Sequence, residues 1–330
     1  MMKTIKFLSI RKFTTIMSIV LILASALSLT SKGLNLGIDF TGGIQIEISF
    51  ETAPNIENVR SNLGSGGYDD AIVQNSGSSQ DLMVRIPPRD GITNKKVGED
   101  VIGLLQGEYI STDVAKEVID PTGSYDVIGL GGYENPVTLK SSEYISAQVG
   151  EELTEQGGLA MIFALIMIMI YIVFRFQWKF SIGAVLALIH DVMITLGIFS
   201  FFQLTFDLSV LAAILAVVGY SLNDTIVIYD RIRENFRSMR TAETLNILNS
   251  AITQTIKRTI ITSSTTLLVL LSLFVFGGSS LEGFSIALIV GVLIGTYSSI
   301  FVASTSIFYL DISTTDLIPV KREEVDDGMP

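Results

Sequence analysis

The sequence has no cysteine and a single histidine, His190. A chain without cysteine can form no disulfide, no thiol nucleophile and no thiolate metal site, and one histidine excludes a metal centre built from several imidazoles. Apolar residues are abundant instead. They make up 48% of the 330 residues, and the mean hydropathy is +0.53. Because a soluble protein of this length is seldom so apolar, the composition predicts a membrane protein.

Charge is unevenly distributed along the chain. Residues 31–157 hold 20 Asp and Glu against 8 Lys and Arg, a net charge of −12, whereas the rest holds 13 acids and 14 bases, a net charge of +1. Two parts that differ so much in charge are expected to lie in two different environments.

Six apolar stretches approach or exceed the length needed to cross a bilayer, which is about 20 residues of helix. They are Phe13–Leu29, Leu159–Phe174, Phe180–Phe202, Leu208–Tyr229, Ile260–Phe276 and Phe284–Tyr309. Lys and Arg cluster on one side of the membrane if the chain crosses six times, and the opposite connections, FFQLTFD and GGSSLEG, contain neither. The positive-inside rule therefore predicts that both termini are cytoplasmic and that residues 31–157 lie outside.

This topology divides the chain into five parts. They are a cytoplasmic N-terminus at 1–12, a first span at 13–30, a periplasmic domain with its connecting helix at 31–157, five further spans at 158–310 with a cytoplasmic amphipathic loop at 231–258, and a cytoplasmic tail at 311–330. One alternative stays open for the first span. Its basic start, apolar middle and Ala24-Ser25-Ala26 are also typical of a cleaved signal peptide.

The acidic segment alternates apolar and polar residues as strands do, between stretches with helical spacing. Its predicted elements are strand Gly43–Phe50, helix Ile56–Leu63, strands Ala71–Gln74 and Leu82–Ile86, helix Val97–Leu105 and strand Val114–Val118, then a helix at Ser141–Glu155 that leads to the second span. The order β-α-β-β-α-β fits a small α+β domain of ferredoxin-like type. Because this segment has no histidine, no cysteine and no Gly-x-Ser-x-Gly, it is interpreted as a binding or gating module without chemistry.

Asp224 lies in the fourth span, where an unpaired charge is costly. Helical spacing places small or polar residues around it: Tyr220, Ala216, Ala213, Gly219 and Ala212. Small residues allow close contact between helices, so Asp224 is expected to point into a bundle and not into lipid. The alternative is that it marks only the end of the span.

Two other polar sites leave their roles open. His190 and Asp191, midway along the third span, are either a structural pair that bonds to neighbouring helices or a functional pair. Arg258 opens the fifth span at a depth similar to that of Asp224. It either forms a salt bridge with Asp224 or extends its charge toward the membrane interface.

The connection between the fourth and fifth spans is amphipathic. Apolar residues recur there at helical spacing: Leu245, Leu248, Ile252 and Ile256. This pattern predicts a helix that lies on the membrane surface or packs on the ends of the bundle. A run of hydroxyl side chains follows in the fifth span, within QTIKRTIITSSTT, and is suited to holding water or bridging helices.

Several segments resemble the signatures of one family. LGIDFTGGIQIEI at 36–48 follows the first span and VGEEL at 149–153 precedes the second. The others are HDV at 190–192, VGYSLNDTIVIYDRIREN at 218–235, QTIKRTIITSSTT at 254–266 and FGGSSLEGFSIALIVGVLIGTYSSIFVAS at 276–304. In this order and spacing they are specific, and over most of its length the chain resembles the SecF protein-export family of the RND superfamily.

The resemblance implies six spans of RND type and a periplasmic domain after the first span, in a bacterial inner membrane. It implies association with SecD and, through it, with the SecYEG channel, its accessory subunits and the translocating preprotein. The family is proposed to draw preproteins outward with the energy of a proton or sodium gradient. It needs no other cofactor and binds no nucleic acid, and its spans face membrane lipid.

The resemblance also assigns roles to residues. Asp224 and Arg258 match the positions that the family links to ion conduction. Asn223, Asp191 and His190 are further candidates for a proton relay. Four residues belong to the matched motifs without an assigned chemical role: Asp39, Gly42, Gly43 and Gly219.

Two other classes of function are compatible with parts of the sequence. A half-size RND-type permease for another substrate would share the spans and would also need a partner. An intramembrane aspartyl protease would use two aspartates on neighbouring spans, as Asp191 and Asp224 are, but the Gly-x-Gly-Asp pattern of such enzymes is absent. A passive channel is disfavoured, because no span has the pattern of a polar pore lining.

Overall fold

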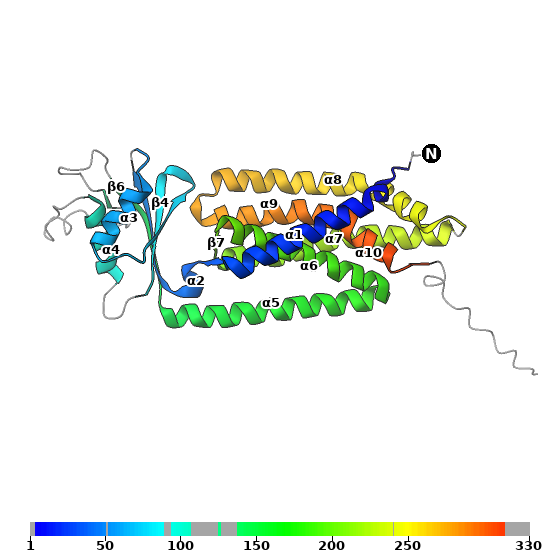
Figure 1. The fold of residues 1–330 in the computed structure, drawn as a ribbon, viewed down its shortest axis with the longest axis horizontal. Helices are drawn as coiled ribbons and strands as arrows, with labels where there is room; N and C mark the ends of the chain where they lie inside the picture. Colours follow the sequence, from blue (N-terminus) through cyan, green and yellow to red (C-terminus); the bar gives the residue numbers. More distant parts are fainter. Residues whose placement is uncertain are drawn as a thin grey trace, which may run out of the picture.

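The computed structural model describes residues 4–50, 52–88, 94–106, 125–126, 137–239 and 241–313. The chain forms a bundle of long helices with a small domain of strands and short helices at one end (Figure 1). The end of the bundle that carries this domain, where Leu208 lies, is termed the domain end. The opposite end, where Ser238 lies, is termed the far end.

Within the described residues, six helices are long and apolar enough to cross a membrane, which confirms the predicted spans. They are α1 (Arg11–Ser31) with η1 (Phe7–Ile10) before it, α5 (Ala147–Arg175), α6 (Trp178–Phe202), α7 (Leu208–Ser238), α8 (Thr244–Phe276), and α9 (Ser279–Ser298), which continues through the π-helical turn η2 (Ser299–Ala303) into α10 (Ser304–Tyr309). A helix satisfies its own backbone hydrogen bonds, which is the requirement for crossing lipid. The protein is a multi-pass α-helical membrane protein.

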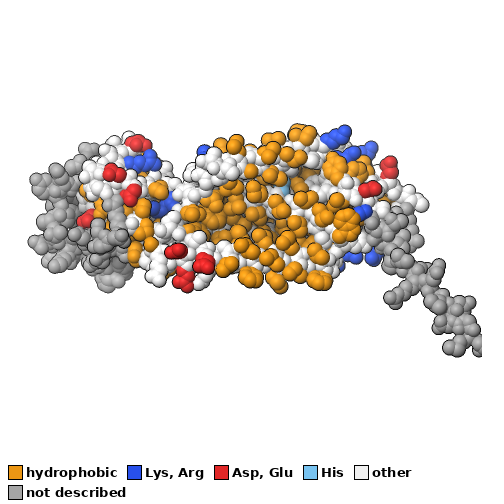
Figure 2. Space-filling model, turned by 60° about the horizontal axis from the view of Figure 1, so that its bottom comes forward, with side chains coloured by type: hydrophobic (Ala, Val, Ile, Leu, Met, Phe, Trp, Pro, Cys, Tyr) orange, Lys and Arg blue, Asp and Glu red, His pale blue; other side chains and the backbone are white. Residues whose placement is uncertain are grey.

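The helices differ in how much of their surface the rest of the chain covers. α6, α7 and α9 form the centre of the bundle, whereas α1, α5 and α8 leave most of their apolar side chains uncovered. Figure 2 shows an apolar belt across the face of the bundle in view, with Lys and Arg gathered at the far end. Because lipid tails are as apolar as these side chains, the belt carries no penalty in a membrane.

In its described residues, the small domain is a five-stranded antiparallel sheet with two helices. Its strands are β2 (Gly43–Phe50), β3 (Ile72–Ser76), β4 (Ser78–Ile86), β5 (Tyr125–Asp126) and β6 (Val137–Ile145), in the order β3-β4-β2-β6-β5, and its helices are α3 (Ile56–Ser65) and α4 (Asn94–Gln106). Ile46 and Ile48 of β2 alternate toward a core shared with Leu63 of α3 and Val101 of α4. The order β-α-β-β-α-β of β2 to β6, apart from β5, confirms the predicted ferredoxin-like domain.

The last described strand of this domain, β6, covers residues where the sequence predicted the start of a helix. The predicted strand Val114–Val118 lies outside the described residues. The strand that pairs with β2 is β6, so the expected helix Ser141–Glu155 is wrong at its start, and α5 begins only at Ala147. Residues 141–145 carry weak local preferences, and pairing along the whole of β2 decides their conformation.

Of the two arrangements predicted for the helix between the fourth and fifth spans, the structure has the one that packs on the end of the bundle. α7 continues to Ser238, and α8 begins at Thr244 and runs without interruption into the membrane. Leu248 and Ile252 are fully buried, in the same apolar cluster as Ile307 of α10. The apolar face of this segment is therefore covered by protein at the far end of the bundle and not by lipid.

A short strand pair joins the domain to the bundle. β1 (Asn35–Leu36), which follows α1, pairs in parallel with β7 (Thr205–Phe206), which lies between α6 and α7. α2 (Ile38–Thr41) then leads into β2. The segment that enters the domain is thus hydrogen-bonded to the segment that starts α7.

Candidate ion-coupling site and the domain junction

Asp224 lies within the central helix α7 and is only 2% exposed. Its Oδ2 atom is buried and has no hydrogen-bond partner among the described residues. A buried carboxylate oxygen without a partner is costly as an anion, and binding a proton or a cation removes that cost. The structure thus places Asp224 inside the bundle and not at its surface.

Of the small residues expected to bring helices close to Asp224, Ala213 is buried in the bundle and the other three are not. Gly219, Ala216 and Ala212 are exposed, and a Cβ atom on Gly219 would meet nothing within 4 Å. The close contact comes from α9, where a Cβ atom on Gly295 would lie 3.0 Å from the Cβ atom of Ser221. A side chain on Gly219 would therefore meet no neighbouring helix among the described residues.

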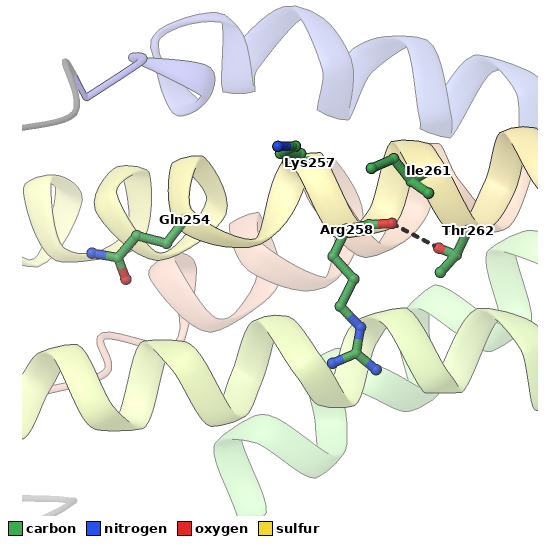
Figure 3. A pocket seen from close by; sticks show the side chains of 5 residues that line it. All are labelled: Gln254, Lys257, Arg258, Ile261 and Thr262. Carbon is green, nitrogen blue, oxygen red and sulfur yellow. Dashed lines mark hydrogen bonds between the residues drawn. The ribbon is translucent and has the colours of Figure 1, made fainter.

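Arg258 lies on α8, which packs against α7, but it forms no ion pair with Asp224 among the described residues. Its side chain is exposed and extends from α8 toward α7, whereas Lys257 points to another side (Figure 3). Arg258 also lines an open hollow of about 420 Å³ with Gln254, Lys257, Ile261 and Thr262. Its positive charge still acts on the Asp224 carboxylate through space. Arg258 and Asp224 thus lie on neighbouring helices without forming an ion pair.

Asn223 does not join this site. Neighbouring residues on an α-helix point about 100° apart, and the Asn223 side chain is exposed where Asp224 is buried. Among the described residues, no hydrogen bond or ion pair joins the Asn223 side chain to Asp224 or Arg258.

His190 and Asp191 form a fully buried pair at the centre of the bundle. The His190 Nδ1 atom lies 2.9 Å from Asp191 Oδ1. The other carboxylate oxygen, Oδ2, accepts hydrogen bonds from Ser221 of α7 at 2.5 Å and from Ser298 of α9 at 2.7 Å. The pair therefore joins three central helices, and both serines are contacts that sequence patterns did not reveal.

Other hydroxyl groups extend this polar layer across the bundle. Tyr220 donates to Ser263 at 3.1 Å, and Ser263 lies 2.7 Å from Thr296 Oγ1 of α9. Tyr297 donates to the Thr14 carbonyl at 2.9 Å and stacks on His190 with ring centroids 5.9 Å apart. Of the predicted hydroxyl run in α8, Ser263 makes these interhelical bonds.

Asp39 belongs to the segment that enters the domain, yet it contacts the start of α7. Its Oδ2 atom accepts a hydrogen bond from the Leu208 backbone N–H at 2.9 Å. Asp207, the residue before α7, accepts from the Val210 N–H at 2.8 Å. The first N–H groups of a helix lack partners within it and attract negative charge. Two carboxylates, one from each segment, therefore cap the helix that carries Asp224.

Gly42 and Gly43 allow the chain to turn from α2 into β2. Their φ angles are +68° and +117°, which favour glycine. A Cβ atom on Gly42 would lie 2.7 Å from the Ala147 Cα atom at the start of α5, and one on Gly43 would overlap the Ile86 carbonyl. The two glycines thus permit α2, β4 and α5 to meet at one point.

Arg85 completes the junction and was not singled out by its sequence pattern. It is 4% exposed and donates to the Leu36 carbonyl and to Asn35 Oδ1, each at 3.0 Å. Burial lowers the pKa of the Arg85 guanidinium, and the Asp207 carboxylate acts in the opposite direction. The sequence offered one signal for this role. Side chains alternate along β4, so Arg85 lies on the face of the strand opposite the core.

Fold and site together define a multi-pass α-helical membrane protein with a ferredoxin-like domain attached to its central helix. The pattern described as "Protein export membrane protein SecD/SecF, C-terminal" matches residues 131–312, and the SecD/SecF GG motif matches residues 27–54. The chain belongs to the SecD/SecF family of protein-export membrane proteins.

Individual relatives support this assignment. The protein translocase subunit SecF of Pseudomonas aeruginosa is 46% identical over 327 residues, which cover 99% of this chain and 98% of the relative. The crystal structure of SecDF from Thermus thermophilus has a TM-score of 0.79 at 31% identity. The match covers 94% of this chain but 39% of that longer chain. A SecDF structure in a super-membrane-facing form, with the same identity and coverages, has a TM-score of 0.64.

The names of these relatives separate the classes of function. They describe a protein translocase subunit, which is a transport component and not an enzyme. This agrees with the predicted lack of catalysis. No relative reported above is named as a permease for another substrate or as a protease.

Proposed function

We propose that this chain acts with SecD to promote translocation of preproteins through the SecYEG channel, driven by the ion gradient across the bacterial inner membrane. The family and the SecF relatives support a role in protein export. SecD is proposed as the partner because the matched SecDF chain is much longer than this one. The proposal needs no cofactor other than a proton or sodium gradient.

The observation that carries the proposal is the burial of the Asp224 carboxylate. A carboxylate that is 2% exposed and has an oxygen without a hydrogen-bond partner among the described residues is suited to bind and release an ion. Moving one elementary charge across a potential of 100 mV supplies about 2.3 kcal/mol. That is enough to bias a conformational equilibrium, and repeated cycles can do work.

The proposed role of Arg258 depends on how far its guanidinium lies from the Asp224 carboxylate. When α7 and α8 approach, the guanidinium favours the ionised carboxylate, and when they separate, burial favours the neutral form. A change of charge on Asp224 would therefore be linked to a change in the contact between the two helices. Asp191 and His190 are proposed to take part from the neighbouring helix α6.

The junction offers a route from this site to the domain. A shift of α7 along its axis moves Leu208 and Thr205, and these residues are bonded to Asp39 and to β1. Because β1 and α2 lead directly into β2, such a shift would reorient the domain. The solved super-membrane-facing form of SecDF supports more than one arrangement within the family.

The orientation follows from the distribution of charge. Lys and Arg gather at the far end of the bundle, so this end is proposed to be cytoplasmic and the domain periplasmic. Lipid covers the apolar belt. A Ser65→Cys variant tests the orientation, because Ser65 is exposed on the domain. A membrane-impermeant thiol reagent should label it in whole cells, and resistance to labelling would refute the orientation.

Preprotein export in cells tests the function. Asp224→Asn keeps the shape of the side chain but cannot ionise, so it should abolish the contribution to export while SecD still co-purifies. Arg258→Lys keeps the charge without the planar guanidinium and should cause partial loss. Asp224→Glu keeps the carboxylate, and residual export is expected. Full export by Asp224→Asn would show that Asp224 is structural.

A further inference from the structure

The last membrane span is interrupted by the π-helical turn η2 between α9 and α10. A π turn takes in one residue more than an α-helical turn, which disturbs the regular pairing of its carbonyl groups, and such turns are frequent at functional sites. Two side chains bond to carbonyls of this turn. The Ser304 hydroxyl donates to the Ser299 carbonyl at 3.3 Å. The Tyr229 hydroxyl of α7 donates to the Ala303 carbonyl at 3.2 Å.

Tyr229 is held in place from several sides. Its side chain is fully buried, and its ring packs edge-on against Phe180 and Phe176, with ring centroids 4.9 Å and 5.9 Å apart. Gly183 of α6 makes room for the hydroxyl, because a Cβ atom there would overlap it and would lie 3.3 Å from the Ala303 carbonyl. A hydrogen bond inside the bundle therefore fixes α7 to the π turn.

One buried hydroxyl next to the turn is left without a partner. Thr305 of α10 is 3% exposed, and its Oγ1 atom has no hydrogen-bond partner among the described residues. A serine or threonine within an α-helix can bond to the carbonyl four residues earlier, as Ser306 does with Val302 at 2.7 Å. For Thr305 that carbonyl is the one of Phe301, inside the π turn, and the bond is not formed. Conversion of η2 into a regular α-helical turn would offer Thr305 this bond.

We propose that η2 is a switch between a π-helical and an α-helical form and that Tyr229 is the positioning residue that holds it in the π-helical form. That form has the bond from Tyr229 to Ala303. The α-helical form has the bond from Thr305 to Phe301 instead. An α-helix turns by about 100° per residue, so loss of the extra residue from the turn rotates α10 against α9 by about that angle.

The switch links the movement of α7 to the last span. This inference rests on the proposed ion coupling, in which α7 moves when Asp224 binds or releases its ion. Tyr229 follows Asp224 by five residues on α7, so a shift of this helix carries both. At 3.2 Å the bond to Ala303 is long for a hydroxyl donor, and a withdrawal of about 0.5 Å breaks it. Ile307 of α10 is fully buried and α10 packs on α6, so the rotation changes the contact between these helices.

The distance between two spin labels on the last span tests the switch. Because the chain has no cysteine, labels can be placed at Leu293→Cys on α9 and Tyr309→Cys on α10, both exposed positions. The labelled full chain is reconstituted with SecD in lipid nanodiscs, and pulsed electron paramagnetic resonance gives the distance distribution. We expect one main distance, for the π-helical form. Tyr229→Phe removes one hydrogen bond from that form, so the share of a second distance should rise about fivefold. An unchanged distribution in Tyr229→Phe would overturn the proposal.

Two further variants test which bonds set the balance. Thr305→Val removes the hydroxyl that the α-helical form bonds, with little change of shape, so adding it to Tyr229→Phe should reduce the second distance about fivefold. Tyr171→Phe removes the same atom from an exposed tyrosine of α5 and should leave the distribution unchanged. No reduction with Thr305→Val, or a second distance in Tyr171→Phe, would overturn the switch.

The spin-label distances are a separate readout from export. If Asp224→Asn abolishes export while Tyr229→Phe leaves the distances unchanged, the proposed function stands and the switch fails. If Tyr229→Phe gives the second distance and Asp224→Asn exports normally, the switch stands and the ion-coupling role of Asp224 fails.

Discussion

The Oδ2 atom of Asp39 accepts a hydrogen bond from the backbone N–H of Leu208 at 2.9 Å. Asp39 lies four residues before β2 of the domain, and Leu208 is the first residue of α7. The bond therefore joins two segments that are 169 positions apart in the chain. It gives a carboxylate of the SecD/SecF GG motif region a physical role, which is to cap the helix that carries Asp224.

Removal of this cap should weaken the junction. Asp39→Ala leaves the Leu208 N–H without its acceptor and should reduce stability by about 1 kcal/mol, with reduced export. Asp39→Asn is the matched control, because its amide oxygen still accepts the bond, and it should retain most of the function. Thermal unfolding and preprotein export, measured on the same variants, test whether the cap contributes to stability and function. Equal behaviour of Asp39→Ala and wild type would show that the cap is dispensable.

Gly43 should not tolerate a side chain. Its φ of +117° is strained for alanine, and the added Cβ atom would meet the Ile86 carbonyl, so Gly43→Ala should displace β2 from β4 and lower the amount of folded protein. Gly77→Ala is a suitable control. Gly77 also has a positive φ, +70°, but a Cβ atom there meets nothing within 4 Å. Limited proteolysis should distinguish the two, and equal resistance would contradict the close approach.

The domain should fold without the membrane helices if it includes β6. β6 pairs with β2 from Val137 to Ile145, so a fragment of residues 36–146 should unfold cooperatively. A fragment of residues 36–126 leaves one edge of β2 unpaired and should be markedly less stable. Urea unfolding followed by circular dichroism compares them. Similar midpoints for the two fragments would mean that β6 is not part of the core sheet.

The stability of that domain should depend on the charge of Asp81. Burial tends to raise the pKa of Asp81, but hydrogen bonds from Lys140, Ser49 and Ser78 outweigh it, and the net pKa is lowered. A lowered pKa in the folded state means that the stabilisation is present above the ordinary aspartate value of about 3.9 and is lost as the pH falls below it. The 36–146 fragment should therefore lose stability in acid, and Asp81→Asn should lose less. Parallel pH profiles would contradict this.

The parts of the structure that were predictable from the sequence are those that depend on local patterns. The apolar runs predicted the six membrane helices, and alternation in GIQIEISF predicted β2 with its bounds from Gly43 to Phe50. In contrast, β6 is specified by pairing with β2, and residues 141–145 alone do not reveal it. The spacing of Leu245, Leu248, Ile252 and Ile256 predicted a helix after Thr244, but it did not reveal that this helix continues into the fifth span as one element, α8.

The site was predictable in identity but not in geometry. Asp224 and the His190–Asp191 pair stand out because charges are rare within apolar runs. Their contacts were not predictable. Nothing in the sequence marks Ser221 and Ser298, which become partners of Asp191 only when α6, α7 and α9 pack together. The predicted Asp224–Arg258 ion pair is not formed in this arrangement, because Arg258 remains exposed on α8. The capping role of Asp39 requires the fold to bring two distant segments together.

The central claim is that Asp224 couples ion movement to export, and ion flux in reconstituted vesicles tests it most directly. Vesicles containing this chain with SecD and SecYEG are loaded with a pH-sensitive dye, and an ion gradient is applied with and without an unfolded preprotein. The wild-type complex should conduct protons in a manner that depends on the preprotein. Asn223→Ala, at the exposed neighbouring position, should behave like wild type. Asp224→Asn should reduce the flux to that of vesicles without protein, and wild-type flux in that variant would contradict the account.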